Sequence, residues 1–299
     1  MTRSATGRRR KEALQGWMLL VPALAIMLVF TVYPVFRSVY LSLFKYRMGK
    51  VPEYIALENY TYLFGNSTFW KVMRNTLVFA LITVIPSMIL GLCLALLVNR
   101  RGRHIGFIRS AFFYPSVMPM IAIASVWMFI YMARNGLFDQ LLVSFGLQPA
   151  NVLSNKDTVL PAMAVMYVWR EAGYLMVFFL SGIQSINQDV LEAAAIDGAG
   201  RFQRIIHVTL PGIKSTFMIL LIMNIGHLLD TGFEIQYLLK SPGTMHVAYT
   251  VDLYVLEYGT KAQEIGLATA AGIFKSIVAI ILLTGANFIS KRLGEDSLL

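Results

Sequence analysis

Charged and polar side chains stand inside long apolar stretches of this sequence, where they must bind a ligand, water or one another. On insertion scales, a charged side chain at the centre of a bilayer costs about 2.5–3.5 kcal/mol, so such residues usually face a cavity or a partner. The residues are Trp169, Arg170 and Glu171 in one stretch, Asn224, His227 and Asp230 in a second, and Lys275 in a third. They are the first candidates for contact with a polar solute.

Asn224, His227 and Asp230 recur every third residue and therefore share one face of a helix. The hydroxyl groups of a polar solute need hydrogen-bond donors and acceptors, and the ring faces of a cyclic solute stack on aromatic side chains. We predict that a solute path is bordered by Trp169, Arg170, Tyr174, Asn224, His227 and Asp230.

The same side chains also have a structural interpretation. Lys275 or Arg170 could bond to Asp230 or Glu171 and so hold helices together. Arg170 and Glu171 are adjacent and point about 100° apart on a helix, so we expect no simple pairing along one face. A third interpretation makes His227 a proton relay.

The sequence offers no set of residues for catalysis. It lacks the Gly-x-x-x-x-Gly-Lys-Ser/Thr phosphate-binding loop, and the fragment at 272–276 has the wrong spacing and lies in an apolar stretch. Histidine, cysteine and carboxylate residues show no metal-ligand spacing, and Ser, His and Asp are scattered. We therefore expect no enzyme activity, no metal and no bound cofactor on this chain.

Long apolar blocks must position these residues. The chain has 299 residues, of which 57% are hydrophobic and only 14% charged, whereas a soluble domain carries about 25% charged residues. Six blocks reach the length of about 20 residues that a membrane helix needs: 17–35, 75–98, 111–132, 159–183, 215–239 and 265–288. Because backbone groups in lipid must bond within their own segment, we predict an all-α polytopic protein with six transmembrane helices.

The net charge of +10 comes mainly from basic residues beside the apolar blocks, without interleaved aromatics. This pattern indicates orientation in a lipid bilayer and not nucleic-acid binding. One set of connecting segments, which includes both termini, holds 14 basic residues and the opposite set holds 9, so we predict that both termini are cytoplasmic. The predicted organisation is a basic N-terminus (1–15), a transmembrane domain (16–290) with a cytoplasmic loop at 185–213, and a tail (291–299).

The arginines at positions 8–10 and the apolar block after them also resemble the start of a cleaved signal peptide. The block is too long for a simple signal core and has no clear small-residue cleavage site, so we expect an uncleaved first span.

The 185–213 loop is unusually ordered in its sequence. Asn187 is a good helix N-cap, and a small-residue helix-forming stretch follows it. Gly198 and Gly200 then favour a break, and a second short helix is predicted to end where Pro211 turns the chain back into the membrane. Small residues on a helix permit close approach of another protein, although the loop could also be an ordinary connector.

The spacing in this loop resembles a known family. Glu192-Ala193-Ala194, then Gly198, then Leu210-Pro211 resembles the EAA loop of permease subunits of binding-protein-dependent ABC importers. Val208 stands where the family more often has isoleucine. Further similarities lie at Asn75-Thr76, Arg109, Phe112-Phe113, Pro115, Trp127, Gly136-Leu137 and residues 180–184, and the likeness covers roughly residues 15–290.

The resemblance implies a type I importer permease in the bacterial inner membrane, without its own ATPase. It implies a second permease subunit, two copies of an ATPase that bind ATP and Mg²⁺, and an extracytoplasmic solute-binding protein. By the resemblance, the residues that couple to the ATPase are Glu192, Ala193, Ala194, Asp197, Gly198, Leu210 and Pro211.

Within the family, the sequence is similar to the carbohydrate branch, which handles maltose-type sugars, glycerol phosphate or polysaccharide fragments. The stretch 233–237 with Ser241-Pro242 departs from the Gly-Gly-Pro of many members and looks closer to the polysaccharide-fragment permeases. Arg170 and Lys275 inside the membrane favour an anionic, uronate-containing oligosaccharide.

Two other classes of membrane protein compete with this interpretation. An ion-coupled transporter needs no coupling loop and usually shows inverted repeats, which we do not find. A membrane enzyme acting on lipid or glycan needs a convergent catalytic set at one depth, which the sequence lacks.

Overall fold

A computed structural model describes residues 3–100, 102–226, 229 and 232–292, with side chains from residue 14 onward. These residues form helices and one short two-stranded ribbon. The chain divides into two compact units, the first made of residues 1–65 and 255–273 and the second of residues 66–254 and 274–299. His227 and Asp230, two of the predicted path residues, lie outside the described residues.

The first unit begins with one long helical stretch: α1 (Arg3–Met27), the π-helical turn η1 (Leu28–Val32) and α2 (Tyr33–Ser42). Its segment Leu14–Ser42 is long and apolar enough to cross a membrane. The stretch runs past its predicted end at residue 35. Pro34 closely follows the π-helical turn η1, and the backbone at Val32 keeps helical angles, so the proline does not stop the helix.

Ordered structure also follows α2 in the first unit, where the sequence predicted a loop. It comprises β1 (Phe44–Lys45), β2 (Glu53–Tyr54), α3 (Glu58–Gly65) and the π-helical turn η4 (Glu257–Lys261). The two strands pair antiparallel. The Asn59 amide donates to the carbonyls of Ser42 at 2.7 Å and Phe44 at 3.0 Å, and Arg47 forms an ion pair with Glu264.

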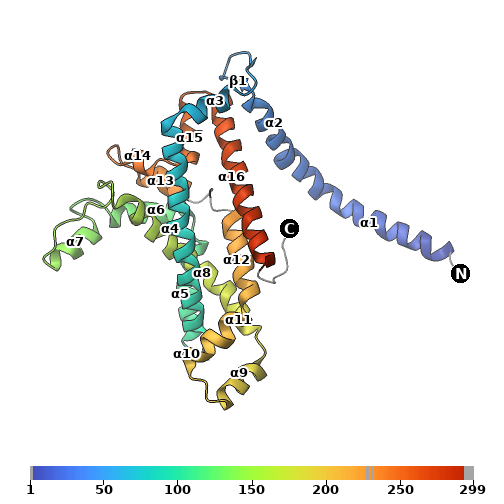
Figure 1. Ribbon diagram of the computed structural model, residues 1–299, viewed down its shortest axis with the longest axis vertical. Helices are drawn as coiled ribbons and strands as arrows, with labels where there is room; N and C mark the ends of the chain where they lie inside the picture. Colours follow the sequence, from blue (N-terminus) through green and yellow to red (C-terminus); the bar gives the residue numbers. More distant parts are fainter. Residues whose placement is uncertain (1–2, 101, 227–228, 230–231, 293–299) are drawn as a thin grey trace. The chain divides into compact units, whose positions relative to one another are not determined.

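The second unit holds a bundle of helices and the loop at 185–213 (Figure 1). Its first helices are α4 (Ser67–Val98), α5 (Ile105–Val117), α6 (Met120–Ile130), α7 (Leu137–Ser144) and α8 (Val159–Gln184). Then come α9 (Gln188–Ile196), α10 (Arg201–Arg204), the π-helical turn η2 (Ile205–Thr209), α11 (Leu210–Gly212) and α12 (Lys214–Gly226). The last are α13 (Phe233–Leu239), α14 (Met245–Ala248), α15 (Val251–Leu256) and α16 (Ile265–Arg292), of which α15 and α16 run across the boundary between the units.

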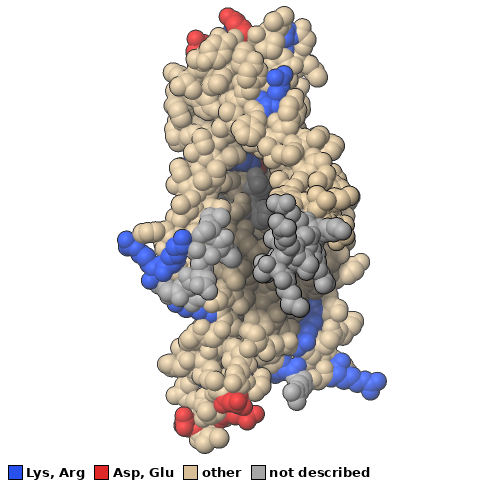
Figure 2. Space-filling view, turned by 90° about the vertical axis from the view of Figure 1, so that its right-hand side faces the viewer, with Lys and Arg blue, Asp and Glu red and all other residues tan. Residues whose placement is uncertain are grey.

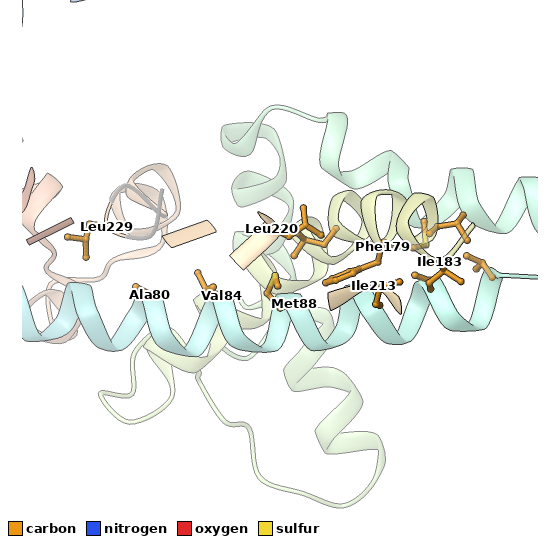
Figure 3. Packing of buried hydrophobic residues seen from close by; sticks show 13 residues of the cluster. Ala80, Val84, Met88, Phe179, Ile183, Ile213, Leu220 and Leu229 are labelled. Carbon is orange, nitrogen blue, oxygen red and sulfur yellow. The ribbon is translucent and has the colours of Figure 1, made fainter. Parts of the chain in front are cut away.

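The packing of α4 against α8 forms the core of the bundle. Gly91 of α4 lets the two backbones approach closely, because a Cβ there would meet Leu175 Cβ at 2.6 Å and the Ala172 carbonyl at 3.2 Å. Met88 of α4 and Phe179 of α8 are buried in the same apolar cluster (Figure 3). Small residues at a contact between apolar helices are what allow such close packing in membranes.

Within the described residues, four single helices are long and apolar enough to span a membrane, and the number rises to six if two bent pairs each count as one span. The third predicted span is such a pair, because α5 and α6 meet at 99°. Pro119 supplies the break, since it precedes α6 with an extended ψ of 135°. The bend is far sharper than a proline kink in one helix.

The predicted fifth span at 215–239 is wrong as a single helix. α12 ends at Gly226 and α13 begins at Phe233. Gly232 has a φ of +85°, in the left-handed region, which no continuous α-helix accepts. The second bent pair instead joins residues 201–212 to α12 at 63°.

Candidate functional site

The loop between α8 and α12 folds as two helices separated by a glycine turn. The Asn187 side chain accepts a hydrogen bond from the Asp189 backbone N–H at 3.0 Å, which confirms it as the N-cap of α9. Gly198 follows α9 with a φ of +78°. Its neighbour Ala199 donates its N–H back to the Ala194 carbonyl at 3.0 Å, closing the helix end. The predicted break at Gly198 is therefore confirmed.

The second half of the loop is longer than predicted. Gly200 begins it and donates its N–H to the Gln203 side chain at 2.8 Å. α10, η2 and α11 then follow without a gap, so Pro211 lies within helical backbone and the prediction that it ends the helix is wrong. Pro211 closely follows the π-helical turn η2, and the backbone at Thr209 keeps helical angles, so the proline does not interrupt the helix. The chain turns two residues later, at Ile213.

The end of this loop that leads into α12 packs against the helical bundle. Ile213 is 1% exposed and belongs to the apolar cluster with Phe179 and Ile183 of α8, as Figure 3 shows. Gly212 lies against Ile186, whose Cδ1 would be 3.0 Å from an added Cβ. This end of the loop is therefore packed against α8 and leads directly into α12.

The first helix of the loop, α9, is not covered by other described parts of the chain. No residue of α9 is buried, and its apolar side chains Val190 and Ile196 are 50% and 87% exposed. Asp and Glu side chains gather at this end of the second unit (Figure 2). They include Asp189, Glu192 and Asp197, all exposed. Bulky apolar groups on a polar tip are typical of a surface that another protein covers.

Two predicted path residues are exposed on α8. Trp169 and Tyr174 are 45% and 36% exposed, and Val165 and Val177 of the same helix are exposed as well. Trp169 packs against Trp127 of α6, with ring centroids 5.8 Å apart. Both residues remain predicted path residues.

Arg170 is committed to partners within the chain. Its Nη1 lies 3.0 Å from Glu171 Oε2, and its Nη2 donates to the Ser116 carbonyl at 3.2 Å. This ion pair confirms the structural interpretation of Arg170, and it forms although the two residues are adjacent because the long guanidinium arm crosses the angle between them. Ser116 lies at the end of α5, so Arg170 satisfies a carbonyl that the bend leaves without a helical partner.

Asn224 bonds mainly within its own helix. Its Nδ2 donates to the Leu220 carbonyl at 2.8 Å and lies 3.8 Å from Met88 Sδ. It remains a predicted path residue, because its amide oxygen makes no hydrogen bond with the described part of the chain.

Comparison with known proteins adds the decisive observation. Residues 87–295 match the family "Binding-protein-dependent transport system inner membrane component". The chain belongs to this family. This confirms the resemblance, the all-α permease fold and the inner-membrane location, and it places the chain among transport components and not enzymes.

Several relatives match this permease along most of its length. It is 34% identical over 248 residues to the polygalacturonan/rhamnogalacturonan permease YteP of Bacillus subtilis, covering 82% of this chain and 77% of YteP. It is 30% identical to the trehalose/maltose permease MalF of Thermococcus litoralis, covering 95% of each chain. A bacterial alginate ABC transporter, crystallised with an alginate pentasaccharide-bound periplasmic protein, matches with a TM-score of 0.89 and 26% identity, covering 97% of this chain and 99% of that chain.

The structure of the permease also identifies residues that sequence reasoning missed. Asp252 is the ion-pair partner of Lys275, where the sequence offered Asp230 or Glu171. Asp139, 2% exposed, accepts backbone hydrogen bonds from Arg134 and Ala150. In the sequence, Asp139 is visible only as a lone acid within the mainly apolar stretch 137–142. Its partners are backbone N–H groups before and after α7, and no local pattern of residue types predicts such contacts.

Proposed function

We propose that this permease is one of two membrane subunits of an ATP-driven importer. The two subunits would form the path for a sugar or oligosaccharide that an extracytoplasmic binding protein delivers. The exposed apolar tip of α9 carries this proposal, because Ile196 at 87% exposure needs a covering partner. The sequence has no phosphate-binding loop, so that partner supplies the ATPase.

The anchoring of the loop supports a mechanical role for the ATPase contact. A helix that docks in a groove of a partner moves with that partner. Since Ile213 is buried against α8, movement of α9 would tilt α8 and α12 together. Trp169 and Tyr174 lie on α8, so the proposed path would change shape when the ATPase changes state.

For the substrate, we propose an anionic oligosaccharide that contains uronic acids. Polygalacturonan and alginate, named in two of the matches, are both polymers of uronic acids. The membrane-embedded cations do not support this choice, because Arg170 pairs with Glu171 and Lys275 with Asp252. A neutral sugar is the second candidate, favoured by the likeness to the trehalose/maltose permease.

A pair of glycine substitutions tests the coupling role. Gly198 and Gly49 have φ values of +78° and +77°, and a Cβ at either position would meet nothing within 4 Å. Replacing each with Trp adds the same backbone strain, so a difference between the variants reports what docks there. We expect Gly198→Trp to lose co-purification of the ATPase and Gly49→Trp to keep it. Retention of the ATPase by Gly198→Trp would overturn the assignment of this loop.

Uptake into proteoliposomes tests the substrate. The complete transporter with its binding protein is supplied with labelled oligogalacturonate or with a malto-oligosaccharide of equal length. We expect ATP-dependent uptake of the oligogalacturonate to be on the order of tenfold faster, a preference that needs about 1.4 kcal/mol. The opposite preference would reject the uronate and leave the permease role intact.

A further inference from the structure

A shallow groove lies between the end of α4 and the start of α10. Its volume is about 320 Å³, and it is lined by Leu96, Leu97, Arg100, Arg201, Phe202 and Ile205. The lining therefore joins four apolar side chains to two arginines. None of these residues belongs to the predicted coupling set or to the predicted solute path.

The apolar part of the groove lies at the end of a membrane span. α4 ends at Val98, and Leu97 one residue earlier is 53% exposed. Phe202, on the other wall, is 74% exposed. At this depth a span passes from hydrocarbon to lipid headgroups, so apolar side chains here meet the upper part of an acyl chain.

The two arginines come from different segments. Arg100 lies two residues beyond the end of α4, and Arg201 is the first residue of α10. Both are exposed, and neither makes an ion pair or a side-chain hydrogen bond within the described part of the chain. Their charges are therefore available to an anion held between them.

The surrounding charges are also mainly positive. Arg201 borders a second hollow of about 340 Å³ with Arg204 and Glu192, and Arg100 borders a third with Arg109 and Glu192. Among the lining residues that the structure describes, Glu192 supplies the carboxylate of both hollows. It does not line the groove itself.

We propose that this groove binds an anionic phospholipid of the cytoplasmic leaflet. The phosphate would lie between Arg100 and Arg201, because a guanidinium forms charge-assisted, bidentate hydrogen bonds with phosphate. One acyl chain would run along Leu97 and Phe202. Basic pockets between membrane helices on the cytoplasmic side suit such headgroups. The lipid would tie the end of α4 to the second half of the coupling loop.

The side of the membrane rests on the proposed coupling role of this loop. The lipid site itself can be tested without ATP or sugar. If the protein does not bind lipid, the transport proposal is unaffected. If the unmodified permease does not co-purify with an ATPase, the transport proposal is rejected and the lipid site can still be tested.

The test uses the intact transporter complex in a neutral detergent. Phosphatidylglycerol, phosphatidylcholine with the same acyl chains, or inorganic phosphate is titrated in, and retained lipid is measured by native mass spectrometry. We expect phosphatidylglycerol to be retained, and the double variant Arg100→Gln/Arg201→Gln to weaken its binding on the order of tenfold or more. Phosphatidylcholine and inorganic phosphate should neither be retained nor compete.

The control variant is Arg103→Gln/Lys291→Gln, which removes the same charge from exposed residues outside the groove. It should bind phosphatidylglycerol like the unmodified protein. Equal weakening by the control would show general surface attraction, and competition by inorganic phosphate would show a site for a free anion. If the groove variant loses the ATPase while keeping the lipid, the groove belongs to the ATPase interface. Each of these three results overturns the proposal.

Discussion

Lys275 of α16 donates a hydrogen bond from Nζ to Asp252 Oδ1 of α15 at 2.5 Å. Their side chains are 13% and 22% exposed, so the pair is largely withdrawn from solvent. This contact confirms the structural interpretation of Lys275, with a partner that the sequence did not offer. It ties two helices across a separation of 23 residues.

Removing either charge of this pair should destabilise the protein. Lys275→Met leaves the Asp252 carboxylate partly buried without its ammonium partner, and we expect a loss of about 2–3 kcal/mol, at or below the range for fully buried pairs. The double variant Lys275→Met/Asp252→Asn should recover part of that loss. Thermal unfolding in detergent measures both. Additive losses in the double variant would mean that the two charges do not interact.

Gly173 should be intolerant of any side chain. A Cβ there would overlap the Phe112 carbonyl, where α8 crosses α5. We expect Gly173→Ala to cost about 1–3 kcal/mol, as overpacking does. Gly285→Ala in α16 is the control, because a Cβ there would meet nothing within 4 Å, and alanine should be neutral or favourable there. Equal melting temperatures for the two variants would contradict the close crossing.

Asp139 should hold the segment between α6 and α8 in one conformation. Its carboxylate accepts N–H groups from Arg134 at 3.0 Å, Ala150 at 3.0 Å and Asn151 at 3.3 Å. Asp139→Ala would leave these donors without their acceptor, and each buried loss costs about 1–3 kcal/mol. We expect faster hydrogen exchange at Ala150 and Asn151. Asp157→Ala removes an exposed acid from the same loop and should leave the exchange unchanged.

The exposed aromatic residues of α8 should affect transport more than stability. We expect Trp169→Ala and Tyr174→Ala to lower uptake on the order of tenfold with little change in melting temperature. The loss of one stacking or hydrogen-bonding contact with the solute, at about 1.4 kcal/mol, corresponds to a factor of ten in uptake. Val165→Ala is the control, since Val165 is 55% exposed and lies one turn before Trp169 on the same helix. Normal uptake by both aromatic variants would remove α8 from the path.

Arg170→Ala should differ from these variants by lowering stability as well as uptake. The side chain satisfies the Ser116 carbonyl beside the bend and balances Glu171. Asn224→Ala, measured alongside, should lower uptake more than stability if its free amide oxygen faces the solute. Unchanged uptake for both Arg170→Ala and Asn224→Ala would contradict their place in the path.

The break in the third predicted span depends on residues outside that span. Apolar blocks predict helices because each backbone group must bond locally, and that rule held at α4, α8 and α16. The rule does not predict where a span breaks, because side chains of neighbouring helices can bond the backbone N–H and C=O groups that the break leaves unpaired. Arg170 does this for α5, from a helix more than 50 residues away in the chain.

The sequence by itself determined the membrane class, the long helices, the N-cap at Asn187 and the glycine turn at Gly198. These features depend on hydrogen bonds and backbone angles within a few residues, which local residue types decide. Only the tertiary structure decided that Lys275 pairs with Asp252, that Arg170 bonds to Ser116 and that two arginines meet beside an apolar groove. Such pairings depend on which distant segments lie together, and the charge pattern of one chain allows several.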